Sequence, residues 1–92
     1  MMRTRYYLGL TDKDGQPVPE ATVADIGRRF HSGCTLYQAT GWWEGNTEPS
    51  VVIETLTEGR PEAERLAGEL QELANQTSVL WTQEWVRGGF TS

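Results

Sequence analysis

The chain has 92 residues, a hydrophobic fraction of 37% and nine aromatic side chains (four Trp, three Tyr and two Phe). This composition suits one globular domain with a thin core and excludes a disordered tail. The net charge of −5 disfavours binding to RNA or DNA, because affinity for nucleic acid comes largely from Lys and Arg on phosphates.

The first part of the sequence predicts a strand followed by a short helix. Residues 3–11 (RTRYYLGLT) alternate as a strand does, with apolar positions at Tyr6, Leu8 and Leu10. A loop follows, marked by an Asp-Gly pair and two prolines. Residues 19–30 (PEATVADIGRRF) then carry an apolar stripe at helical spacing: Val23, Ile26, Gly27 and Phe30.

The rest of the sequence predicts a hairpin, a second helix and a last strand. Residues 34–43 (CTLYQATGWW) and 50–57 (SVVIETLT) are the two hairpin strands, and the connection Glu44–Pro49 is longer than a two-residue turn. Residues 78–86 (SVLWTQEWV) form the last strand, and 87–92 a loose tail. Residues 60–76 form a helix with a regular apolar stripe: Ala63, Leu66, Ala67, Leu70, Leu73 and Ala74.

The order β-α-β-β-α-β predicts a ferredoxin-like α+β sandwich, with a four-stranded antiparallel sheet and both helices on one of its faces. We expect a single domain over residues 1–92, with the first and third strands in the middle of the sheet. The second face of the sheet then has no helix to cover it.

Strand alternation predicts which side chains lie on this open face. If Tyr6, Leu8, Val51 and Ile53 meet the helices, the open face receives the residues between them. In the hairpin, Trp43 would then lie on the open face and Trp42 in the core. We expect the open face to carry Arg5, Tyr7, Gly9, Thr11, Tyr37, Ala39, Gly41, Trp43, Val52, Glu54 and Leu56.

The last strand is ambiguous, because two alternating sets compete for the core. One set holds Leu80, Thr82 and Val86, and the other holds Val79, Trp81 and Trp85. The second set is bulky for a thin sandwich. We therefore expect Trp81, Gln83 and Trp85 on the open face, where they would join Tyr7, Tyr37 and Trp43 around Glu54.

An aromatic surface of this size is uncommon on a monomer. It predicts self-association as a homodimer through the open face. The alternative is a pocket for a small molecule or another protein. The candidate ligand or interface residues are Tyr7, Tyr37, Trp43, Glu54, Trp81, Gln83 and Trp85.

Glu54 is the carboxylate most suited to chemistry, because it interrupts an apolar run on a central strand. A half-buried acid often has a raised pKa, and Glu54 with Tyr7 would form an acid–base pair in a small enzyme. The structural alternative is an ion pair with Arg5 across the first and third strands. We favour the ion pair, and with it a non-enzymatic protein.

Other chemical signals are weak. His31 and Cys34 form an H-x-x-C element, but no further His or Cys could complete a zinc site. The sequence has no nucleotide-binding or nucleophile-elbow motif, so we expect no cofactor and no metal. A single cysteine fits a reducing compartment, and no apolar run reaches the roughly 18 residues of a membrane span. We therefore expect a cytoplasmic protein.

A G-x-W strand, a turn, an E-P-S-x-V-x-E strand and a later S-V-L strand follow one another in the last two thirds of the chain. The residues concerned are Gly41, Trp43, Glu48, Pro49, Ser50, Val52, Glu54 and Ser78 to Leu80. This pattern resembles a small bacterial family of unknown function. The resemblance implies a ferredoxin-like fold and no established activity. The short accessory type of chain also suits a bacterial or phage product, for instance one that binds a host protein.

Overall fold

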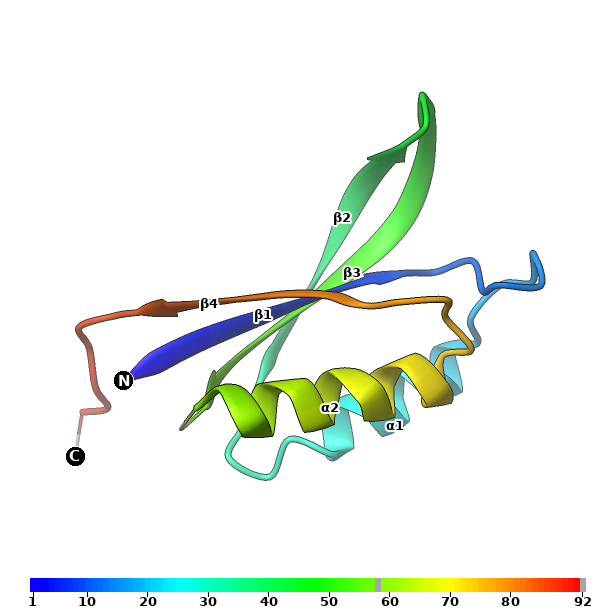
Figure 1. Cartoon of the computed structure of the whole chain (residues 1–92). Helices are drawn as coiled ribbons and strands as arrows, with labels where there is room; N and C mark the ends of the chain where they lie inside the picture. The colour runs from blue at the N-terminus through cyan, green and yellow to red at the C-terminus, as the bar shows by residue number, and fades with distance from the viewer. Residues whose placement is uncertain (58, 92) are drawn as a thin grey trace.

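The computed structural model describes residues 1–57 and 59–91. Its elements follow the order β1 (Met2–Gly9), α1 (Glu20–Arg28), β2 (Thr35–Trp43), β3 (Asn46–Thr57), α2 (Arg60–Leu73) and β4 (Leu80–Trp85). The strands form one four-stranded antiparallel sheet in the order β2-β3-β1-β4. Both helices lie on the same side of this sheet (Figure 1). The predicted ferredoxin-like α+β fold is confirmed, with β1 and β3 in the centre.

The core lies between the sheet and the two helices. It forms because alternate residues of β1 and β3 face the apolar stripes of α1 and α2. Tyr6, Leu8 and Ile53 are fully buried, as are Ile26 from α1 and Leu70 from α2. Of the predicted stripe on α2, Ala63, Leu66 and Ala67 are also buried. Neither helix in the part of the chain that the structure describes is long and apolar enough to cross a membrane.

The first helix ends two residues earlier than predicted. Beyond Arg28 the chain continues with bonds of three-residue spacing, from Arg29 N to Ile26 O at 3.0 Å and from Phe30 N to Gly27 O at 3.3 Å. Phe30 still packs in the core, with its ring centroid 5.8 Å from that of Tyr6. The last residue of the predicted apolar stripe is therefore buried although it lies beyond the end of α1.

The connection between β2 and β3 is a tight two-residue turn, so the prediction of a six-residue loop over 44–49 is wrong. Trp43 pairs with Asn46, and β3 begins at Asn46. Glu44 and Gly45 have φ angles of 48° and 80°, as a turn of type I′ requires at both central positions.

Pro49 made the longer loop look necessary, because proline cannot donate a hydrogen bond within a sheet. Its carbonyl accepts a bond from Leu10 N at 2.9 Å, so the backbone of Pro49 faces the end of β1. The carbonyl of Leu10 in turn accepts from Val18 N at 2.8 Å and needs no donor from Pro49. The proline is therefore tolerated inside β3.

The far half of the β2–β3 hairpin extends beyond the rest of the sheet. β1 pairs with β3 only as far as Ser50, whereas β2 accompanies β3 to Asn46. Figure 1 shows this half rising away from both helices. We call residues 40–49 the hairpin arm. It gives the molecule an elongated shape of 43 × 26 × 24 Å.

Candidate functional site

The open face of the sheet is built from cross-strand rows, because directly paired residues of antiparallel strands point to the same side. One row crosses all four strands and contains Tyr37, Val52, Tyr7 and Leu80. The next row contains Thr35, Glu54, Arg5 and Thr82. Successive rows on one face lie about 7 Å apart, since each residue of a strand rises about 3.4 Å.

The first of these rows, Tyr37, Val52, Tyr7 and Leu80, is apolar, and we call it the tyrosine row. Val52 is only 5% exposed although no helix covers it, and in the register it lies between Tyr7 and Tyr37. The two tyrosines remain partly exposed, and Leu80 at the edge is 63% exposed. The predicted positions of Tyr7 and Tyr37 on the open face are confirmed.

Next to the tyrosine row lies a cluster of four charged side chains. Arg5 Nε donates to Glu54 Oε1 at 2.7 Å, and Arg3 Nε lies 3.9 Å from the same oxygen. Arg3 and Arg5 also donate to Glu84 on β4. The hydrogen bond with Glu54 raises the pKa of Arg5, and the bond from Arg3 lowers the pKa of Glu84. Both shifts favour the charged forms of Arg5 and Glu84.

The pairing of Glu54 with Arg5 agrees with the structural alternative from the sequence. Arg5 Nε lies 2.7 Å from Glu54 Oε1, so an ion pair accounts for the position of this carboxylate in the apolar run of a central strand. The acid–base hypothesis for Glu54 and Tyr7 therefore loses its main support. What remains on this face is a cluster of two arginines and two carboxylates beside two tyrosine rings.

The prediction that Trp81, Gln83 and Trp85 lie on the open face is wrong. Trp81 pairs with Tyr6 and packs against the core, and the Arg60 guanidinium lies 6.0 Å from its ring. Gln83 Nε2 donates to Thr4 Oγ1 at 3.0 Å and to Gly59 O at 3.3 Å, on the helix side. Trp85 pairs with Met2 on that side and is largely exposed.

The reason for this error is that the helix side of β4 is not uniformly apolar. The buried side chain of Thr4 lies in the register opposite Gln83, so this end of the sandwich is polar and accepts an amide. Leu80, which size and hydrophobicity favoured for the core, lies on the open face instead. The sequence signal that could have shown this is a polar residue at a helix-facing position of each central strand, Thr4 on β1 and Thr55 on β3, which pair and are both buried.

The two adjacent tryptophans occupy opposite faces of the hairpin arm, as predicted. Trp43 shares the open side with Gly41, Ala39 and Tyr37. Trp42 lies on the helix side, but the prediction that it belongs to the core is wrong. The helices do not reach the arm (Figure 1). Trp42 is therefore 72% exposed, and Trp43, on the open face, is 75% exposed.

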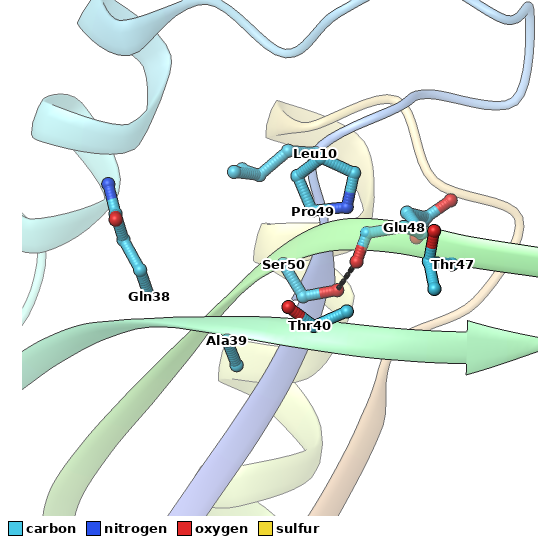
Figure 2. A pocket seen from close by; sticks show the side chains of 8 residues that line it. All are labelled: Leu10, Gln38, Ala39, Thr40, Thr47, Glu48, Pro49 and Ser50. Carbon is cyan, nitrogen blue, oxygen red and sulfur yellow. Dashed lines mark hydrogen bonds between the residues drawn. The ribbon is translucent and has the colours of Figure 1, made fainter.

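At the root of the arm lies a hollow of about 480 Å³ that the sequence did not predict. Figure 2 shows its lining from β2, β3 and the chain after β1, with the Ser50 Oγ hydrogen bond to the Glu48 carbonyl at 3.3 Å. The Glu48 side chain folds over Gly9, where any Cβ atom would collide with its carboxylate. The lining residues are Leu10, Gln38, Ala39, Thr40, Thr47, Glu48, Pro49 and Ser50.

His31 and Cys34 do not form a reactive pair. Cys34 is partly buried, and its Sγ donates to the Gly27 carbonyl at 3.8 Å. Burial raises the pKa of this thiol, which keeps it protonated and unreactive. Within residues 1–57 and 59–91, no group of three or more His, Cys, Asp and Glu side chains is placed to hold a metal ion.

Comparison with known proteins identifies a structural relative. No protein-family model matches the sequence, and no curated protein matches it significantly. The fold is similar to a phage SAM lyase in its apo state, with a TM-score of 0.64 and 23% identity, over 90% of this chain and 78% of that chain. At this identity the similarity shows a shared fold.

Proposed function

We propose that this protein is a small SAM-binding enzyme of the lyase type, with its site on the open face of the sheet beside the hairpin arm. The observation that carries the proposal is the similarity to a phage SAM lyase over 90% of the chain. It fits the expectation, from the sequence, of a bacterial or phage product. A cytoplasmic location, where S-adenosylmethionine (SAM) is made and used, belongs to the same proposal.

The chemistry of the open face supports this ligand. SAM combines an adenine base, a sulfonium cation and an amino acid with a carboxylate and an ammonium group. The tyrosine row offers Tyr7 and Tyr37 as surfaces on which a base can stack. The next row offers Arg5 to a carboxylate, and Glu54 lies beside it. The net charge of −5 favours a ligand that carries an excess positive charge.

A lyase reaction on a sulfonium needs no metal or redox partner. The C–S bond breaks, its electron pair stays on sulfur, and a neutral thioether leaves. The carbon accepts electrons either from the substrate's own carboxylate or from a neighbouring C–H bond that loses its proton. The first route needs no protein acid or base, only a substrate held in a reactive conformation. It therefore agrees with the loss of support for Glu54 as an acid or base.

The test is to incubate the purified chain with SAM and follow its conversion to an adenosine thioether by chromatography. We expect turnover that falls about tenfold or more in Arg5→Ala, because the ligand loses a charged partner. Arg29→Ala is the matched control, since Arg29 lies in the loop after α1 and away from the open face. Absence of both turnover and SAM binding, tested by calorimetry at millimolar ligand, contradicts the proposal.

A second candidate function is the one the sequence favoured, a non-enzymatic protein that self-associates through the open face. The observation in its favour is the exposure of Leu80 at the end of the tyrosine row. On this candidate, Leu80→Glu converts a homodimer to a monomer in light scattering, and SAM neither binds nor reacts. The phage-type variant of this candidate, in which the face binds a host protein, predicts a monomer until that partner is added. The resemblance to a small bacterial family likewise stays a prediction.

A further inference from the structure

The two edges of the sheet differ in how they are protected. β4 is six residues long, and its Glu84 is held by Arg3 and Arg5. β2 is nine residues long and contains no Asp, Glu, Lys, Arg or Pro; residues 30–43 as a whole contain none. Natural sheets guard their edges with charges, prolines or short strands, because a free edge offers backbone groups to other chains. β2 has none of these guards.

The outward backbone groups of β2 can be identified from the hairpin register. Pro49 pairs with Thr40, yet the Pro49 carbonyl bonds to Leu10 N at 2.9 Å, on the side away from β2. The pair of Thr40 and Pro49 is therefore not hydrogen-bonded, and the N–H and C=O of Thr40 point to the outer edge. By alternation, the same groups of Leu36, Gln38 and Trp42 also point outward.

We propose that β2 pairs antiparallel with β2 of a second copy of this chain, so that two four-stranded sheets join into one continuous sheet. A copy of the same strand suits this edge because its lack of charge lets two chains of net charge −5 meet without like charges in contact. The edge strand offers no charged side chain to a partner that binds through ion pairs.

The strand is also complementary to itself in one register. A twofold axis at Ala39 brings Gln38 opposite Thr40 of the other copy, and Leu36 opposite Trp42, so that the outward groups of each strand meet those of the other. Trp42 then covers Leu36, and both are exposed in the single chain. On the other face, Tyr37 lies opposite Gly41, an aromatic–glycine pair of the kind that stabilises sheets. This register uses the whole of Thr35–Trp43.

This arrangement accounts for the exposure of the arm and goes beyond the proposed function. It places only Tyr37 of the tyrosine row at the contact and leaves Tyr7, Val52 and Arg5 uncovered, so it is compatible with a ligand on the open face. It also differs from a dimer formed through the open face, because the contact residues belong to the edge strand alone. The two kinds of dimer therefore respond to different substitutions.

The test is the mass in solution, measured by size exclusion with light scattering at micromolar concentration. We expect twice the mass of the chain. Gln38→Lys together with Thr40→Lys places lysines opposite each other in the proposed pair and should weaken association at least about tenfold, since facing like charges disfavour strand pairing and association. Thr77→Lys with Ser78→Lys adds the same charge in the loop before β4 and should leave the mass unchanged.

A second measurement does not depend on the lysine variant folding. In the unmodified chain, hydrogen exchange at the amides of Gln38 and Thr40 should slow as protein concentration rises. A single-chain mass, a mass other than twice the chain, or a dimer that Gln38→Lys with Thr40→Lys leaves intact while Leu80→Glu dissolves it, each overturns the proposal.

Discussion

The helix-backed part of the sheet and the hairpin arm are both made of paired strands, but the side chains of the first are buried and those of the second are exposed. In the first, Tyr6, Leu8 and Ile53 are completely buried. In the second, Trp42 and Trp43 are 72% and 75% exposed, although both lie in paired strands. In both regions successive side chains point to opposite faces of the sheet, so this alternation alone does not bury a side chain.

The difference follows from the lengths of the elements. β3 has 12 residues and spans about 40 Å, whereas α1 has nine residues and spans about 13 Å. Even α2, with 14 residues, covers only about 21 Å. Two short helices therefore cover one end of the long hairpin and leave the other end bare. A core needs a covering layer as well as an alternating pattern.

The largest expected effect tests this difference directly, by truncating one side chain in each region. Ile53→Ala should lower the free energy of unfolding by about 2 to 5 kcal/mol, because it leaves a cavity under the helices. Trp42→Ala should lower it by less than about 1 kcal/mol, because the ring is mostly in water already. Urea denaturation at a concentration that keeps the chain monomeric measures both values.

The two substitutions control for each other, because both remove a large apolar side chain from the same hairpin. A loss for Trp42→Ala as large as that for Ile53→Ala would mean that the arm is packed in solution. The comparison between the two regions would then fail.

The fold was predictable because its signals are local and agree with one another. The stripe from Ala63 to Ala74 defined α2, and the alternation around Tyr6 and Leu8 defined β1. The order of elements then left few topologies. The hairpin turn was missed because Pro49 suggested a break, and only the position of β1, which ends before it, shows why proline is tolerated there.

The site was less predictable because its residues come together through register and helix length. The rows containing Tyr7, Tyr37 and Glu54 follow from pairing β2, β3 and β1. The faces were predicted correctly, but the β2–β3 register was not, because a loop over 44–49 would pair Trp43 with Ser50 instead of Asn46. Which side of β4 faces the helices depends on a polar core position at Thr4, which is recognised only when Thr4 and Thr55 are considered together across two strands. The exposure of Trp42 depends on where the helices stop, which is a tertiary property.

High pH should weaken the helix-backed region selectively. Burial raises the pKa of Tyr6 to about 12, from its ordinary value of 10.0, so the folded protein holds this proton where the unfolded chain releases it. The resulting stability is complete below pH 10 and is lost as pH rises from 10 to 12, up to about 2 to 3 kcal/mol. Denaturation at a series of alkaline pH values measures it.

Tyr6→Phe is the control for this effect. The Tyr6 hydroxyl is buried without a hydrogen-bond partner among the described residues, so its removal should cost little or nothing at neutral pH. The variant should lose less stability than the unmodified chain between pH 10 and 12. An equal alkaline loss in both chains would assign the effect to groups other than Tyr6.

The turn of the arm offers a smaller test of the second region. Gly45 has a φ of 80°, a conformation that costs an L-residue about 1 kcal/mol. Gly45→Ala should therefore weaken the hairpin by about 1 kcal/mol, seen in urea denaturation and in shifted NMR signals of Trp42 and Trp43. Gly88→Ala, after β4 and without neighbours within 4 Å, should change stability by less than about 0.5 kcal/mol.

The smallest effect concerns the charged cluster, which marks the end of the open face farthest from the arm. Arg3 lowers the pKa of Glu84 through a hydrogen bond, so Arg3→Ala should raise this pKa toward its ordinary value. An NMR titration of the carboxylate measures the shift, and Arg28→Ala, which removes an ion pair on α1, should leave it unchanged. Because Arg3 lowers the pKa of Glu84, the ion pair between them is fully present above the ordinary pKa of glutamate. It is lost as the pH falls through the lowered pKa of Glu84. The charge of Glu84 on β4 discourages other strands from pairing with that edge, whereas β2 carries no charged residue. An unchanged pKa of Glu84 in Arg3→Ala would mean that Arg3 does not hold this carboxylate and that the contact from Arg5 at 3.3 Å is sufficient.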